Sequence, residues 1–260
     1  MTQETRLRRG GLSGVPGSVW QVDGLRVLDL GENGLTHLDP RVGALTGLTE
    51  LYLDHNALAE LPAEVGDLTR LRVLDLSDNL LAALPGTVGA LRRLRFLYAA
   101  RLGLTALPET IGGLAELAYL NVAENALTAL PATVGRLTEL RELRAAGNRL
   151  AVLPDELGAL VLLREVHVEH NRLTAVPTTL AGLAELRVLN LRGNELAAVP
   201  DAVRALPALR HLDLRANRVR ALPPWLAQLP ALDKLDLRWN GVDAPGVIAD
   251  LERRGCLVYA

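Results

Sequence analysis

Residues 48–70 read LTELYLDHNALAELPAEVGDLTR, and the same pattern recurs every 23 residues along most of the chain. A fixed period of this length is typical of a solenoid, in which each unit is too small to bury its apolar side alone and stacks on its neighbours. The aligned blocks, with no insertion between them, begin at Leu25, Leu48, Leu71, Leu94, Leu117, Leu140, Leu163, Leu186, Leu209 and Leu232.

The first half of each block predicts one short parallel strand. Leu51 and Leu53 alternate with other residues, as in a strand with one buried face. An asparagine follows three positions after the second inward leucine, where the backbone leaves the strand and loses its hydrogen-bond partners. A carboxamide both donates and accepts, so we expect a structural ladder made of Asn33, Asn56, Asn79, Asn125, Asn148, Asn171, Asn194, Asn217 and Asn240.

The second half of each block turns the chain back towards the next strand. A proline such as Pro62 fixes the backbone dihedral and suits the first position of a short helical turn. The stretch that follows, Val65-Gly66-Asp67-Leu68 in this block, places two apolar residues in the core. We therefore expect strands and short helical turns to alternate.

This pattern, LxxLxLxxNxLxxLPxxVGxLxx, resembles the leucine-rich repeat family. The 23-residue form with proline is similar to the intracellular class found in Ras-binding scaffold proteins, plant intracellular repeat proteins and stand-alone bacterial proteins. The resemblance implies an α/β fold: a curved right-handed coil, with a parallel β-sheet on the concave face and short helical turns on the convex face. It also implies protein binding on the concave side.

Three segments are expected. Residues 1–24 fit a degenerate half-repeat that caps the stack, residues 25–242 hold the ten coils, the last of them incomplete, and residues 243–260 fit a C-terminal cap of one helix and one strand. Asp243 is placed to cap that helix, and Leu257-Val258-Tyr259 reads as the final strand. Cys256 is interpreted as a packed cap residue.

Composition narrows the function. The net charge of −2 argues against nucleic acid or an acidic membrane as a partner. No apolar run is long enough to span a bilayer, and the first residues do not resemble a signal peptide. Cys256, the single thiol, cannot form an internal disulfide, which favours a cytoplasmic location. The preference for arginine over lysine favours a GC-rich, bacterial source.

Function is expected at the outward strand positions, which the repeat leaves free. Four of the eight aromatic residues lie there, and aromatic side chains on rigid strands suit an interface. The candidate partner-binding residues are Tyr52, Asp54, His55, Phe96, Tyr98, Tyr119, Asn121, Arg144, His167, Arg192, Arg215, Arg238 and Trp239. An alternative is that Phe96 and Tyr119 only cover the neighbouring coil.

Two further patterns leave alternatives open. The free positions of the first five coils are mostly acidic, whereas acidic and basic residues are equal in number in the last five. This difference in charge either orients a charged partner or belongs to a solvated surface without such a role. In the fourth coil Ala99 replaces an inward leucine and Leu102 replaces the ladder asparagine. These departures are either a functional concession beside Phe96 and Tyr98 or drift in a tolerant repeat.

The catalytic signals are weak. His167, Glu169 and His170 lie close together, but the sequence offers no clear third ligand on one face, so no metal site is predicted. No cofactor motif is present either, because the glycine-rich residues 10–18 lack the lysine of a phosphate loop. We therefore predict a non-catalytic scaffold that binds a protein or peptide. The alternative is a regulatory or substrate-recruiting subunit of an enzyme encoded elsewhere.

Overall fold

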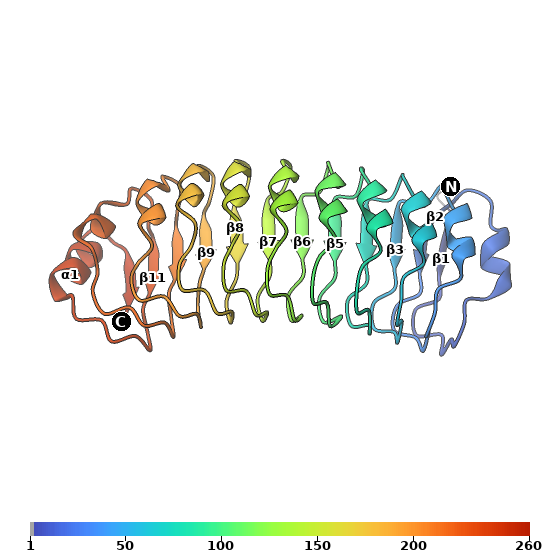
Figure 1. Cartoon of the computed structure of the whole chain (residues 1–260), viewed down its shortest axis with the longest axis horizontal. Helices are drawn as coiled ribbons and strands as arrows, with labels where there is room; N and C mark the ends of the chain where they lie inside the picture. Colours follow the sequence, from blue (N-terminus) through green and yellow to red (C-terminus); the bar gives the residue numbers. More distant parts are fainter. Residues whose placement is uncertain (1–2) are drawn as a thin grey trace. The chain divides into compact units, whose positions relative to one another are not determined.

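A computed structural model describes residues 3–260 and shows one short β-strand in each coil (Figure 1). This confirms the predicted alternation of strands and short helical turns. The strands are β1 (Gln3–Arg6), β2 (Leu25–Asp29), β3 (Glu50–Tyr52), β4 (Val73–Asp75), β5 (Phe96–Tyr98), β6 (Tyr119–Asn121), β7 (Glu142–Arg144), β8 (Glu165–His167), β9 (Val188–Asn190), β10 (His211–Asp213), β11 (Lys234–Asp236) and β12 (Leu257–Tyr259).

The turns between the strands are five-residue 3-10 helices, and one α-helix, α1 (Pro245–Arg253), lies before β12. The 3-10 helices are η1 (Gly17–Gln21), η2 (Pro40–Ala44), η3 (Ala63–Asp67), η4 (Gly86–Ala90), η5 (Glu109–Gly113), η6 (Ala132–Arg136), η7 (Asp155–Ala159), η8 (Thr178–Gly182), η9 (Asp201–Ala205) and η10 (Pro224–Gln228).

The repeated proline lies one position earlier in the turn than the sequence predicts. Pro62 is the N-cap of η3, with an extended backbone (φ −64°, ψ 144°), and is not its first helical residue. Its carbonyl accepts the hydrogen bond from the amide of Val65 at 3.1 Å. The fixed φ of proline therefore orients the carbonyl that starts the turn.

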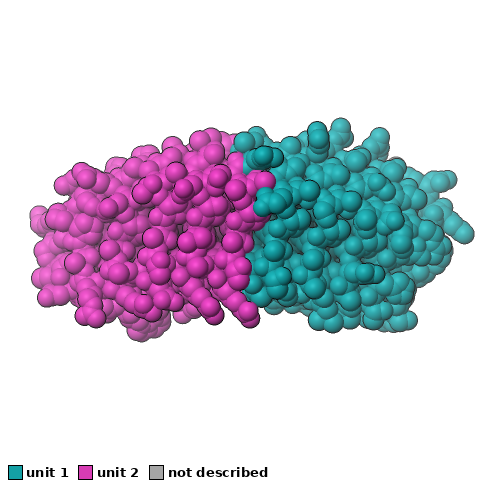
Figure 2. All heavy atoms as spheres, in the orientation of Figure 1, with its two compact units in different colours: residues 1–127, 136–140 teal, residues 128–135, 141–260 magenta. Residues whose placement is uncertain are grey.

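The chain divides into two compact units (Figure 2). The first, unit 1, runs to Leu127 and includes Arg136–Leu140; the second, unit 2, holds Thr128–Gly135 and Arg141–Ala260. In unit 1, β1 to β6 pair in chain order, and in unit 2, β7 to β12 do the same, with every pair parallel.

The register between neighbouring repeat strands equals the sequence period. Leu28 pairs with Leu51, and Leu51 pairs with Leu74. Equivalent leucines therefore stack on one another, and these three side chains are fully buried. Burying a leucine side chain stabilises a fold by about 1.5–3 kcal/mol relative to leaving it exposed, so the stacked core stabilises each unit.

The asparagines hydrogen-bond the backbone of two successive coils. In unit 1, Nδ2 of Asn79 donates to the carbonyls of Leu76 in its own coil (2.8 Å) and Leu53 in the preceding coil (2.9 Å). Its Oδ1 accepts from the amide of Leu58 at 2.9 Å. One buried side chain thus satisfies backbone groups that the strands leave unpaired.

The fourth coil lacks this residue. Leu102 is buried in its place, and Ala99 is buried at the inward strand position. Oδ1 of Asn125, in the next coil, accepts from the amides of Leu102, Gly103 and Leu104 at 3.0–3.1 Å. The departures in this coil are therefore accommodated in the interior, away from the outward positions.

Two backbone features recur in the coils. The residue before each ladder position has a positive φ of 52–64° in every coil from Glu32 to Trp239, and only Gly147 and Gly193 are glycines there. On the turn side, a glycine lies against the next turn: a Cβ on Gly66 would be 2.6 Å from the carbonyl oxygen of Thr87. These glycines allow the turns to stack closely.

The N-terminal segment forms more than the predicted half-coil. β1 pairs with β2, and η1 buries Val19, so residues 3–24 contain both a strand and a turn. A strand at the edge of a sheet pairs through its backbone, so it needs no leucine pattern. For that reason β1 could not be predicted from the repeat.

The C-terminal segment contains the expected helix and strand, with one correction. β12 covers Leu257–Tyr259 as predicted, but Ala244, and not Asp243, is the N-cap of α1, and no side chain caps the helix. Pro245, the first residue of α1, has no backbone N–H and therefore needs no hydrogen-bond acceptor there. Cys256 is buried between α1 and β12, and burial raises the pKa of its thiol.

Candidate functional site

The outward positions of the strands, together with the second and third residues after each strand, form what we call the sheet face. The polar and aromatic side chains predicted to meet a partner are held there by the paired strands, while alternate residues enter the core.

In unit 1, three of the predicted aromatic residues form a cluster on β5 and β6. The ring centroids of Tyr98 and Tyr119 are 4.9 Å apart, and those of Phe96 and Tyr119 are 6.5 Å apart. Tilted rings at these distances attract one another. We call Phe96, Tyr98 and Tyr119 the aromatic cluster.

Tyr52, the fourth predicted aromatic residue, is separated from this cluster by one strand. Asp75 on β4 lies between Tyr52 and Tyr98 in the strand register. The hydroxyl of Tyr52 donates to Oε2 of Glu50 at 2.8 Å, and burial, aided by this hydrogen bond, raises the pKa of Tyr52 to about 12. Burial also raises the pKa of Asp75.

The acidic end of unit 1 is covered by an arginine that the repeat pattern does not single out. Arg8 donates to Asp29, Glu32 and Asp54, with distances of 2.5 Å to Asp54 Oδ1 and 3.0 Å to Glu32 Oε1. Arg9 forms a second ion pair with Glu32. The acidic excess counted from the repeats is therefore reduced by the N-terminal segment.

Asp54 and His55 consequently differ as binding residues. Asp54 is only 7 % exposed and is bound by Arg8, so it is not open to a partner. His55 is exposed, with Nδ1 3.1 Å from Asp54 and Nε2 3.4 Å from Asp78. The arginines at positions 8 and 9 are the signal that could have revealed this arrangement, because β1 brings them beside the first coils.

We expect Arg8→Gln to lower the free energy of unfolding by roughly 1.5 kcal/mol at pH 7, because it removes charge-assisted hydrogen bonds to Asp29 and Asp54. Arg9 and Arg8 also lower the pKa of Glu32. A carboxyl group whose pKa is lower in the folded state than in the unfolded state stabilises the fold at pH values above its unfolded-state pKa. This contribution is lost as the pH falls through the folded-state pKa. Urea unfolding should therefore show the deficit narrowing between pH 7 and pH 3; a constant deficit would contradict this account.

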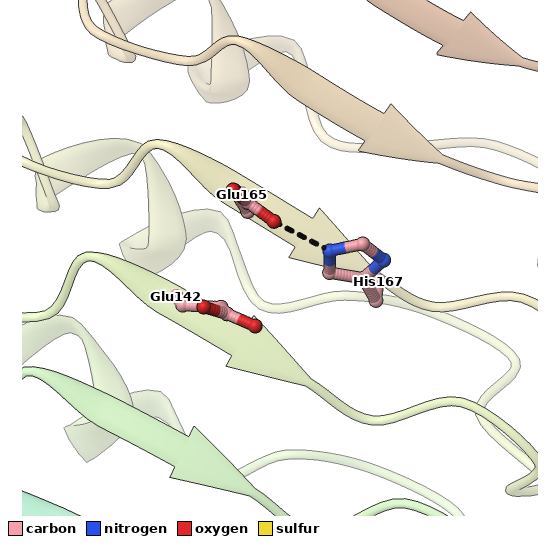
Figure 3. Close-up of side chains that lie close together, drawn as sticks. All are labelled: Glu142, Glu165 and His167. Carbon is pink, nitrogen blue, oxygen red and sulfur yellow. Dashed lines mark hydrogen bonds and ion pairs between the residues drawn. The ribbon is translucent and has the colours of Figure 1, made fainter.

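In unit 2, three potential metal ligands lie close together (Figure 3). Glu142 on β7 pairs in register with Glu165 on β8, and His167 follows Glu165 by two residues. One ligand atom from each of the three lies within 4.8 Å of the others, the only such group of three among residues 3–260. Glu142 was not among the predicted site residues, although the 23-residue shift places it beside Glu165.

Three of the other unit 2 candidates, Arg192, Arg215 and Arg238, form a row of arginines at equivalent positions of successive coils. Arg215 and Arg238 are paired with Asp213 and Asp236 at 2.6 and 2.7 Å. Arg192 has no carboxylate partner within residues 3–260, and its Nε is buried without a hydrogen bond. Its guanidinium carbon lies 5.6 Å from the ring centroid of Trp239, which is 65 % exposed.

A shallow depression of about 140 Å³ adjoins this row on β9, β10 and β11. It is lined by Val188, Leu189, Asn190, His211, Leu212, Asp213, Lys234 and Asp236. A cavity of about 150 Å³ can admit a benzene-sized group, so the depression can receive one side chain of a partner.

Two predicted residues contact atoms close to them in the sequence. Oδ1 of Asn121 accepts from the amide of Ala123 at 3.1 Å, which holds the end of β6. Arg144 donates through Nε to Oε1 of Glu142 at 2.5 Å. Both side chains still belong to the sheet face.

The comparisons with known proteins concern the fold and its repeats. The sequence matches the family described as leucine-rich repeat region over residues 13–102 and 93–192, and a leucine-rich repeat model over residues 230–249. No curated protein gives a significant match. Within the described residues, no helix has the length and apolar character needed to cross a bilayer.

Similar solved structures come from plants and bacteria. The leucine-rich repeat ectodomain of the receptor kinase GASSHO1/SCHENGEN3 from Arabidopsis thaliana, in complex with CASPARIAN STRIP INTEGRITY FACTOR 2, is 30 % identical, with a TM-score of 0.80 over 92 % of this chain and 30 % of that chain. The plant peptide hormone receptor RGFR1 in complex with RGF2 is 25 % identical, with a TM-score of 0.69 over 88 % and 42 %.

A leucine-rich repeat protein of Leptospira interrogans is also 25 % identical, with a TM-score of 0.52 over 99 % of this chain and 84 % of that one. The chain thus spans less than half the length of the plant receptor chains but most of the bacterial one. Together with the stacked leucines and the asparagine hydrogen bonds, these matches show that the chain belongs to the leucine-rich repeat family.

Proposed function

We propose that this chain is a non-catalytic scaffold that binds a protein or peptide on its sheet face, the concave face of the fold. The observation that carries the proposal is the aromatic cluster of Phe96, Tyr98 and Tyr119, which two paired strands hold on that face. A side chain that is already held loses little conformational entropy when a partner covers it. Tyrosine and tryptophan are also enriched among residues that dominate binding energy.

The sheet face of unit 2 offers a second contact region. The guanidinium carbons of Arg192 and Arg238 lie 5.6 and 5.8 Å from the ring centroid of Trp239. Its side chain is 65 % exposed, whereas its φ of 62° is shared with the equivalent residue of the other coils. Exposed tryptophan is enriched among residues that dominate binding energy, so Trp239 is the residue in unit 2 that we expect to contact a partner.

The similar structures support this reading at the level of the fold. Two of the plant proteins were solved in complex with CASPARIAN STRIP INTEGRITY FACTOR 2 and with RGF2. Because this chain spans less than half of each receptor chain, its own partner is inferred from its surface chemistry and not from theirs. We further propose the intracellular, 23-residue class in a bacterium, with a cytoplasmic location, from the repeat pattern and the single buried thiol of Cys256.

Changing Tyr98 and Tyr119 together to alanine is expected to weaken partner capture from a lysate of the native cell at least tenfold, because a buried aromatic contact commonly contributes more than about 1.4 kcal/mol to binding. The measurement is quantitative pull-down with increasing immobilised protein. Leu80→Ala is the matched control. Leu80 is also exposed and apolar, but it follows the ladder residue Asn79 and therefore does not belong to the sheet face. Capture unchanged by the double substitution would exclude the aromatic cluster as the binding site.

The same pull-down separates the alternative function. A regulatory or substrate-recruiting subunit would capture an enzyme in a fixed stoichiometric ratio. A scaffold would instead capture a partner that has no enzymatic activity. Both functions would use the sheet face, so the identity of the captured protein decides between them.

A further inference from the structure

The sheet face of unit 2 carries a group of three potential metal ligands. Glu142, Glu165 and His167 bring two carboxylates and an imidazole within 4.8 Å of one another (Figure 3). All three come from paired strands, which fixes their backbones relative to each other. Their side chains are partly exposed, at 24, 41 and 15 %, so an ion can reach them from solvent.

The electrostatics of this group favour a cation. Glu142 and Glu165 are directly opposite on neighbouring strands, where like charges destabilise a sheet. On β7 and β8 the two carboxylates of the group face one guanidinium, that of Arg144, which is paired with Glu142. A bound cation would offset the repulsion between Glu142 and Glu165.

The existing contacts leave ligand atoms available. Arg144 donates to Oε1 of Glu142, and a carboxylate has two oxygens with about four lone-pair sites, so the second oxygen can coordinate. Nε2 of His167 lies 3.0 Å from Oε2 of Glu165. A metal ion would replace the proton of this hydrogen bond, and two ligands of one tetrahedral zinc ion lie roughly 3.4 Å apart, so a small movement of the side chains would admit it.

We propose that Glu142, Glu165 and His167 form a binding site for a divalent first-row metal ion, with Zn²⁺ as the expected occupant. An imidazole nitrogen with two carboxylate oxygens suits Zn²⁺, whereas Mg²⁺ and Ca²⁺ prefer oxygen ligands alone. Three protein ligands leave at least one coordination position for water or for a group from another molecule.

The test is calorimetric titration of ZnCl₂ into the full chain after treatment with EDTA and dialysis. We expect one Zn²⁺ per chain, with binding weakened at least tenfold by Glu165→Gln and by His167→Ala. His55→Ala is the matched control, because His55 is flanked by Asp54 and Asp78 but lies outside the group; it should change the affinity less than twofold.

A second readout excludes a folding defect. Circular dichroism should be the same for each variant and the original chain without metal, and Co²⁺ should give a visible absorption band that Glu142→Gln abolishes. Failure of Zn²⁺ to bind, or equal affinity in the Glu165 and His167 variants, would overturn the proposal. Neither result would affect partner capture through Tyr98 and Tyr119, so the two proposals fail separately.

Discussion

Gly66→Ala is expected to lower the free energy of unfolding by about 3 kcal/mol, the upper end of the usual cost of overpacking. The added methyl carbon would lie 2.6 Å from the carbonyl oxygen and 2.7 Å from the Cβ of Thr87. Both atoms lie where η3 packs on η4, and the carbonyl cannot move without displacing η4. The measurement is urea unfolding followed by circular dichroism.

Gly86→Ala is the matched control. A Cβ on Gly86 would have its nearest neighbour, Oγ1 of Thr110, at 3.8 Å, which is ordinary contact. Because alanine also restricts the unfolded chain, this change should alter stability by less than about 1 kcal/mol, and in the stabilising direction. Equal destabilisation by the two substitutions would show that close stacking is not the reason for glycine at position 66.

Asn194→Ala is the second substitution with a large expected effect, a loss of about 3 kcal/mol. Nδ2 of Asn194 donates to the carbonyls of Val168 and Leu191, both at 3.0 Å, and Oδ1 accepts from the amide of Leu173 at 3.0 Å. Alanine would leave these buried backbone groups without partners, which is more costly than losing the hydrogen bonds themselves.

The control for this substitution is Asn190→Ala in the same coil. Asn190 lies on the sheet face, and its Oδ1 accepts from the amide of Arg192, at 3.2 Å. Solvent can replace that interaction, so the expected loss is below about 1 kcal/mol. Thermal and urea unfolding of the two variants should therefore differ clearly; similar losses would mean that the ladder asparagine contributes no more than a surface amide.

The repeat predicts the fold well because its constraints are local. Alternation at Leu51 and Leu53 locates a strand, and the spacing to Asn56 locates the end of that strand. The same signals recur in each block and reinforce one another. The proline was placed one residue too far into the turn, since a fixed φ of about −65° suits both the N-cap and the first helical position.

The sheet face is predicted less completely because its contacts cross between coils or come from outside the repeat. Arg8 belongs to a segment without the leucine pattern, and only the pairing of β1 with β2 brings it to Asp54. Glu142 and His167 lie 25 positions apart in sequence and meet through strand register. The repeat identifies which positions face outward, whereas side-chain partners depend on rotamers that the pattern does not specify.

The positive φ before each ladder position restricts how this surface can vary. The ten residues there are Glu32, His55, Asp78, Arg101, Glu124, Gly147, His170, Gly193, Ala216 and Trp239, and none is valine, isoleucine or threonine. Branching at Cβ is strongly disfavoured in this conformation. Residues of different charge, size and aromatic character can therefore replace one another at these ten positions, in evolution or by engineering. β-branched residues are excluded from them.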